Sequence, residues 1–264
     1  MRSLNLYCKS YRNDLERAKN LLQSIQEFNC DNIPFVISVP KRDKQLFIDR
    51  LGTDGYELIC DEDIVERDYD DAHASQQIVK SQYYKTGRSD VVVVIDSDAY
   101  FIRPFYRTTY MFDDDTPYTL MHECKDYLQV SSRHKLGVHE RFRKQFREEM
   151  QRLISRPGRN YDYNASPMIF DNRVWKVFEE KMLPLLGMDI DTALDKFSEA
   201  VCYGETILKF SPIPLVPIEP SFKFFHLPVQ YNECKNILGM TEQMLAETFD
   251  GIVMQSNWNA PIRY

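Results

Sequence analysis

Two aspartates separated by one serine, Asp96-Ser97-Asp98, directly follow an apolar run at residues 91–95. A carboxylate at the end of a buried strand is costly unless a cation neutralises it. Two carboxylates one residue apart can reach the same ion, and oxygen ligands suit Mg²⁺ or Mn²⁺, whose coordination is usually completed by water and phosphates. The motif therefore predicts a Mn²⁺ or Mg²⁺ site at Asp96 and Asp98 that would neutralise a diphosphate leaving group.

The alternative for such a motif is a solvated turn, because closely spaced aspartates occur by chance in acidic chains. We interpret Asp113-Asp114-Asp115 in that way, since no apolar strand precedes it and Pro117 follows it. The strand before Asp96 favours metal binding for the first motif.

The elements that must position this motif alternate between strand and helix patterns in the first half of the chain. The continuous apolar run at 91–95 predicts a central strand buried on both faces. The alternation predicts an α/β fold with a mostly parallel sheet flanked by helices, and ligands bind at the carboxyl ends of such strands. The strands are expected at 4–8, 34–39, 56–60 and 91–95, and the helices at 14–28, 41–50 and 74–86.

The second half is less regular, and we find no repeat and no long linker, so we expect a single domain over residues 1–264. A basic stretch at 133–159 carries nine Lys and Arg against three Glu and predicts one helix with Phe142, Phe146, Met150 and Leu153 as its apolar stripe. Strands are expected at 118–122, 166–170 and 222–226, and further helices at 173–182 and 199–210.

Composition excludes several classes of protein. With 33 Lys and Arg against 40 Asp and Glu, the net charge of −7 argues against a nucleic-acid partner. The longest aliphatic run has five residues, so we expect no transmembrane segment, no signal peptide and a cytoplasmic location. The six cysteines show no spacing typical of zinc sites or disulfides. The glycine-rich phosphate loops GxGxxG and GxxxxGK(S/T) are also absent.

The sequence DSDAY followed by FIRPF, after an apolar strand, resembles the DxD region of GT-A-fold glycosyltransferases. Three further segments, YRNDL at 11–15, QQIVK at 76–80 and YGE at 203–205, resemble a family of uncharacterised GT-A-like proteins found in polysaccharide gene clusters. The resemblance covers most of the chain. It implies a nucleotide-sugar-binding half at 1–110 and an acceptor-binding half at 111–264.

The resemblance also implies a metal-dependent transfer from a nucleotide-sugar, most commonly a UDP-sugar, to a glycan or lipid-linked glycan, with an inverting mechanism favoured. The donor is expected to contact the first strand, the loop after it and the motif. Lys80 and Asp14 each have an equally good structural interpretation, as a solvated helix lysine and as a helix N-cap. The implied donor contacts are Tyr7, Ser10, Arg12, Asp14, Lys80, Asp96 and Ser97.

His226 is implied as a third metal ligand, although a histidine flanked by apolar residues is more often structural. Inversion requires a carboxylate that deprotonates the acceptor. Glu199, which opens a predicted helix, is the first candidate for this base and Glu205 the second.

The resemblance places the acceptor near Asp162, Asn164 and Ser166. The basic stretch 133–159 is expected either to contact an anionic glycan, a lipid-linked diphosphate or a membrane surface, or to be an ordinary solvated helix.

Three other functions stay open from the sequence. A phosphatase of the haloacid dehalogenase type also places a DxD after an apolar strand, but on its first strand. A sugar-nucleotide nucleotidyltransferase would share the first half, but the expected glycine-rich loop after strand one is missing. A non-catalytic sugar- or nucleotide-binding module is the alternative of a different class.

Overall fold

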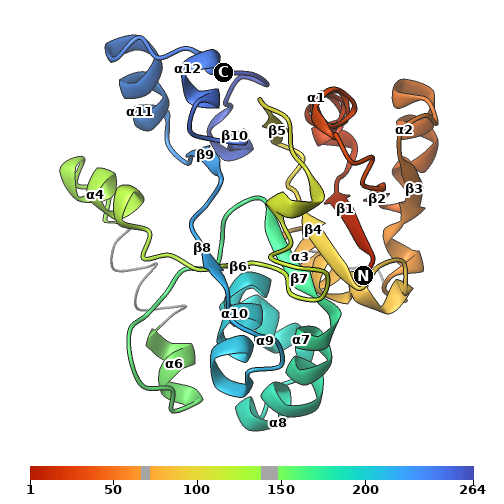
Figure 1. Ribbon diagram of the computed structural model, residues 1–264, viewed down its shortest axis with the longest axis vertical. Helices are drawn as coiled ribbons and strands as arrows, with labels where there is room; N and C mark the ends of the chain where they lie inside the picture. Colours follow the sequence, from red (N-terminus) through yellow and green to blue (C-terminus); the bar gives the residue numbers. More distant parts are fainter. Residues whose placement is uncertain (67–71, 138–147) are drawn as a thin grey trace.

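The central feature of the computed structural model, which describes residues 1–66, 72–137 and 148–264, is a five-stranded sheet (Figure 1). Its strand order is β3-β2-β1-β4-β7, in which β1 to β4 run parallel and β7 pairs antiparallel with β4. The mostly parallel sheet predicted from the sequence is confirmed. The strands are β1 (Leu4–Lys9), β2 (Phe35–Val39), β3 (Glu57–Cys60), β4 (Val91–Val94) and β7 (Met168–Asp171).

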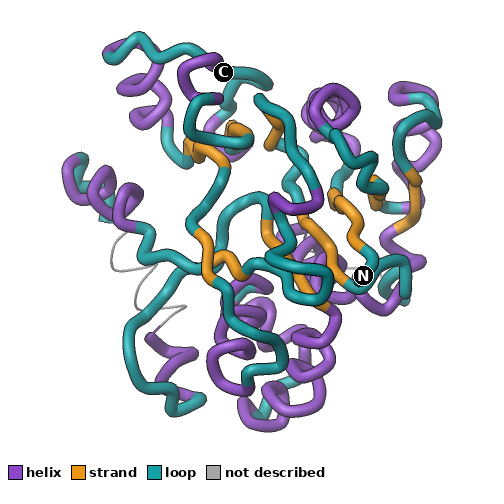
Figure 2. Tube along the Cα trace, in the orientation of Figure 1, coloured by secondary structure: helices purple, strands orange, loops and turns teal. Residues whose placement is uncertain are grey.

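Helices cover both faces of this sheet (Figure 2), as the alternation of strands and helices predicts. One face packs against α1 (Leu15–Phe28) and Phe47 of α2 (Lys44–Leu51). The other face packs against α3 (Ala72–Gln82), α7 (Asn172–Val177), α9 (Ile190–Phe197) and α10 (Glu199–Phe210). All four valines of β4 are buried, so this strand is central as expected.

A second sheet begins where the DSD motif ends. Its order is β5-β10-β9, with β5 (Ala99–Phe101) antiparallel to β10 (Gly251–Met254) and β9 (Phe222–Phe225) parallel to β10. Gly251 is required here, because a Cβ atom would lie 2.3 Å from the Phe222 ring. The motif therefore connects the two sheets, and the C-terminal strand lies beside it.

The predicted single helix at 133–159 is wrong. Helix α4 (Lys125–Arg133) ends where that helix should begin, and the backbone turns through the left-handed conformation at Gly137 (φ 65°). Helix α6 (Glu149–Leu153) is short; Met150 in it is buried, but Leu153 is 41% exposed. Phe142 and Phe146 lie outside the described residues.

The remaining elements are short. They are β6 (Thr119–Leu120) and β8 (Pro217–Ile218), which pair with each other, and α8 (Leu183–Leu186), α11 (Pro228–Tyr231) and α12 (Glu242–Ala246). The predicted helix at 173–182 is present as α7 followed by a π-helical turn. No helix in the described ranges has the length and apolar character needed to cross a bilayer.

Candidate active site

The loop Asp96-Ser97-Asp98 leaves the carboxyl end of β4 and is fixed by three segments that are distant in the sequence. Because every residue of the motif is held, its two carboxylates have a defined place between the sheets. The hydrogen bonds run from Asp96 N–H to Ser166 Oγ (3.0 Å), from Ser97 Oγ–H to Asp14 Oδ2 (3.2 Å) and from Ser256 N–H to Asp98 Oδ2 (2.9 Å).

Lys80 brings a positive charge to this loop from α3. Its Nζ lies 2.7 Å from Asp96 Oδ1 and 3.7 Å from Glu199 Oε1. Only 5% of the Lys80 side chain is exposed, so the interpretation as a solvated helix lysine is wrong. Although burial alone would lower it, the Asp96 and Glu199 carboxylates raise the pKa of Lys80 above its ordinary value. The ammonium group therefore stays charged.

Glu199 enters the site as the first residue of α10, as the sequence predicts. Ser198 precedes the helix as its N-cap, and its Oγ accepts a hydrogen bond from Val201 N–H (3.5 Å). The helix N-terminus stabilises a negative charge at this position. Glu199 is buried, so Lys80 and the helix end hold a carboxylate within reach of the DSD loop.

The carboxylates of the loop are crowded. Burial, followed by the charges of Asp96 and Asp14, raises the pKa of Asp98 to about 7. Such crowding is relieved by a cation, and the hard oxygen donors of Asp96 and Asp98 suit Mg²⁺ or Mn²⁺. The donor set therefore fits a divalent ion held by these two residues.

The expected third ligand does not join them. Across the described ranges, no three His, Cys, Asp or Glu side chains form a group that could hold a metal ion. The His226 ring instead stacks on Phe224 (centroids 4.0 Å apart) and lies beside Tyr127 (4.5 Å), while its Nδ1 is 3.2 Å from Gln255 Oε1. Burial lowers the pKa of His226 to about 4. The structure thus packs His226 among aromatic rings, which is the arrangement that the alternative interpretation as a structural histidine predicts.

Two of the predicted donor contacts are core residues. Tyr7 is 0% exposed; its ring stacks on Tyr83 (centroids 4.0 Å apart), and its hydroxyl lies 2.7 Å from Ser38 Oγ. This arrangement leaves no ring face for a nucleotide base, because Tyr7 points to the α3 face of the sheet. Ser10, directly after β1, is also buried, and among the described residues none hydrogen-bonds to its Oγ.

The loop after β1 contributes one residue to the site. Asp14 occupies the N-cap position of α1, but its side chain makes no capping hydrogen bond. Its carboxylate instead accepts a hydrogen bond from the Ser97 hydroxyl. Arg12 is held away by an ion pair with Asp43 (2.7 Å). Of these two predicted contacts, the structure brings only Asp14 to the motif.

Glu205 belongs to a buried ion pair and not to the site. Its carboxylate accepts hydrogen bonds from the Arg156 guanidinium, including one from Nη2 to Oε1 at 2.9 Å, and from Tyr163 Oη (2.9 Å). Both carboxyl oxygens are occupied and the side chain is 1% exposed. The structure therefore engages Glu205 in this ion pair and does not bring it to the motif.

Sequence reasoning missed two of the residues that hold the loop. Ser166 was expected on the acceptor side with Asp162 and Asn164, whereas its hydroxyl accepts the Asp96 N–H. Asp162 is buried and accepts a hydrogen bond from Asn164 N–H (3.1 Å). Ser256 contributes its backbone N–H, a group that almost every residue type has, so the sequence could not indicate this contact.

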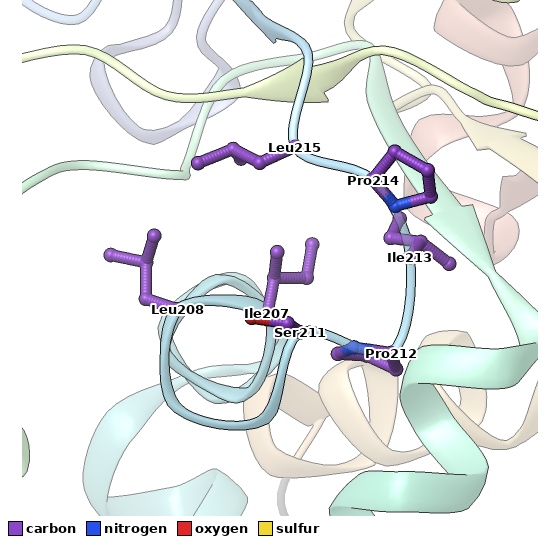
Figure 3. Close-up of a pocket in the computed structure, with 7 residues that line it drawn as sticks. All are labelled: Ile207, Leu208, Ser211, Pro212, Ile213, Pro214 and Leu215. Carbon is purple, nitrogen blue, oxygen red and sulfur yellow. The ribbon is translucent and has the colours of Figure 1, made fainter.

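A pocket of about 570 Å³ lies at the opposite end of α10 from Glu199 (Figure 3). Its lining contains no titratable side chain, so the pocket offers neither an acid nor a base. The lining residues are Ile207, Leu208, Ser211, Pro212, Ile213, Pro214 and Leu215.

The sequence matches no family model and no curated protein. Among solved structures, the chain is similar to the galactosyltransferase LgtC in complex with donor and acceptor sugar analogs, with a TM-score of 0.51 and 12% identity over 97% of this chain and 91% of that one. It is also similar to an active-site mutant of LgtC, with a TM-score of 0.50 and 12% identity over 94% of this chain and 86% of that one. The likeness spans nearly the whole of each chain, and from it we conclude that this protein has the GT-A fold that its motif predicts.

Proposed function

We propose that this protein is a metal-dependent glycosyltransferase that moves a sugar from a nucleotide-sugar, with a UDP-sugar as the first choice, to a glycan or glycoconjugate acceptor. The observation that carries the proposal is the convergence of Lys80, Asp96 and Glu199, from three separate elements, beside Asp98. The fold shared with LgtC, whose structure contains donor and acceptor sugar analogs, supports it.

Each residue of this group has a role that its chemistry suits. Asp96 and Asp98 would hold Mn²⁺ or Mg²⁺, which when bound neutralises the charge that develops on the diphosphate leaving group. Lys80, a buried ammonium paired with Asp96, would contact the same diphosphate. Glu199 is the base that we propose takes the proton from the acceptor hydroxyl, which corresponds to an inverting reaction.

The donor can be identified by a thermal-shift screen of UDP-, GDP-, CMP- and dTDP-sugars, each with and without Mn²⁺. A ligand present at 100 times its dissociation constant stabilises the folded state by about 2.7 kcal/mol, which corresponds to roughly 5–10 °C in a chain of this size. We expect one donor to reach this shift with Mn²⁺ only.

The matched variants for this screen are Asp98→Asn and Asp114→Asn. Asp114 is exposed and lies outside the DSD motif, so its variant should respond like the wild type. The variant at Asp98 should lose the Mn²⁺-dependent part of the shift. A panel in which no donor raises the melting temperature would favour the binding-module or the phosphatase interpretation.

A further inference from the structure

The ammonium of Lys80 lies on an oxygen that the proposed metal would need. Its Nζ lies 2.7 Å from Asp96 Oδ1, which is a direct charge-assisted hydrogen bond. A divalent cation held by the same oxygen would lie close to the ammonium, so the two cations would repel each other.

Other cations near the loop are engaged elsewhere. Arg17 donates to the carbonyl oxygens of Met254 (2.9 Å) and Ala260 (2.7 Å), and Lys9 pairs with Asp61 (3.3 Å). Within the described part of the chain, Lys80 is thus the ion-pair partner of Asp96, and burial fixes it there.

Lys80 also has a second anion within reach. Glu199 Oε1 is 3.7 Å from Nζ, farther than Asp96 by about one ångström. The two carboxylates therefore compete for one positive charge, and the attraction of Lys80 to Glu199 weakens its pairing with Asp96.

We propose that Lys80 occupies Asp96 in the donor-free protein and opposes metal binding, so that the ion is held firmly only when a diphosphate gives the ammonium another anion. This inference rests on the proposed function, because it concerns the same metal. It makes Lys80 a positioning residue for metal loading as well as a donor contact, and it assigns opposite effects on metal affinity to Lys80 and Glu199.

The test is a calorimetric titration of the nucleotide-free protein with Mn²⁺ alone. Lys80→Met removes the charge but keeps most of the side-chain volume, and it should bind Mn²⁺ about tenfold more tightly than the wild type. Glu199→Gln directs Lys80 fully to Asp96 and should bind Mn²⁺ several-fold more weakly. Lys85→Met, which removes a half-exposed lysine paired with Glu179, should leave the affinity unchanged.

Equal or weaker Mn²⁺ binding by Lys80→Met would overturn the inference. If Lys80→Met does not fold, because it leaves buried carboxylates without a counter-ion, the more conservative Glu199→Gln decides: weaker binding supports the inference, and equal or tighter binding overturns it.

The result of this test can be distinguished from the result of testing the proposed glycosyltransferase function. Tighter Mn²⁺ binding by Lys80→Met, together with a wild type that no nucleotide-sugar stabilises, supports the inference about Lys80 and refutes the proposed transferase function. A wild type that uses a donor with Mn²⁺, together with unchanged metal affinity in Lys80→Met, supports the transferase and removes the inference.

Discussion

Glu199 and Glu205 lie on the same helix, and we propose different roles for them that one pair of variants can separate. Glu205→Gln would remove the negative charge that faces the buried Arg156 guanidinium. Arg156 is 7% exposed and Glu205 1% exposed, so water cannot replace the lost partner. Tyr163 would also lose part of its charge-assisted hydrogen bond.

The magnitude follows from the burial of the pair. Breaking a buried ion pair by removing one charge costs about 3–5 kcal/mol, because an uncompensated charge remains inside. A glutamine still offers one acceptor oxygen to Arg156, so we expect the lower end, about 3 kcal/mol. For a chain of this length, that corresponds to a fall in melting temperature of roughly 6–12 °C.

The assay combines urea denaturation with turnover of the donor. Glu205→Gln should lose about 3 kcal/mol of unfolding free energy but keep its activity below its melting temperature. Glu199→Gln should lose turnover but at most about 1 kcal/mol of stability, because Lys80 retains its 2.7 Å contact with Asp96. A Glu205→Gln variant that unfolds with the wild type, or a Glu199→Gln variant with near-wild-type kcat, would refute this assignment.

Three further predictions concern other positions. Ser166→Ala leaves the Asp96 N–H without its acceptor, and we expect the Mn²⁺ titration of the donor reaction to shift about fivefold to higher concentration; superimposable titrations would count against the role of Ser166. Gly204→Ala places a Cβ 2.1 Å from the Tyr163 ring and should cost about 2 kcal/mol or more in urea denaturation, so an unchanged midpoint would contradict the packing. His226, with a pKa of about 4 against about 6.5 unfolded, takes up its proton in the unfolded state first, so from pH 6.5 to 4 the wild type should lose about 3 kcal/mol of unfolding free energy, measured in EDTA, relative to His226→Gln. Asp98, whose pKa is raised, contributes equally to both proteins, and parallel profiles would show that His226 is not the group responsible.

The first half of the fold could be predicted because its patterns are local. The four parallel strands and their helices lie within a few residues of the positions expected from apolar runs and helical spacing. The valines at 91–94 indicate a strand buried on both faces, and such a strand must be central. The position of Asp96 at the carboxyl edge of the sheet follows from that alone.

The sequence could not show which distant residues meet. Lys80 and Glu199 contact each other from two helices on one face of the sheet, and no local pattern relates them. The partner of Glu205 was equally hidden, because Arg156 lies near the end of the basic stretch 133–159 and no local pattern relates it to Glu205. Periodicity predicts that a strand residue faces one side, but it did not tell which side Tyr7 faces.

The prediction of one basic helix at 133–159 was wrong for a local reason. Charge composition over 133–159 suggested one element, but α4 already ends at Arg133 and the backbone turns at Gly137. The small second sheet was missed in part because β5 and β10 contain only three and four residues. Short strands carry little periodicity, and their pairing depends on contacts across the whole chain.

The central claim is that Asp96 and Asp98 hold a metal ion that serves transfer from a nucleotide-sugar. The most direct measurement is the release of nucleotide from the donor that the thermal-shift screen selects, with Mn²⁺, with EDTA, and with Asp96→Asn in parallel with Asp114→Asn. We predict Mn²⁺-dependent release by the wild type and Asp114→Asn, and loss of release in EDTA and in Asp96→Asn, which should keep its fold. Full release in EDTA, or by Asp96→Asn, would contradict the account.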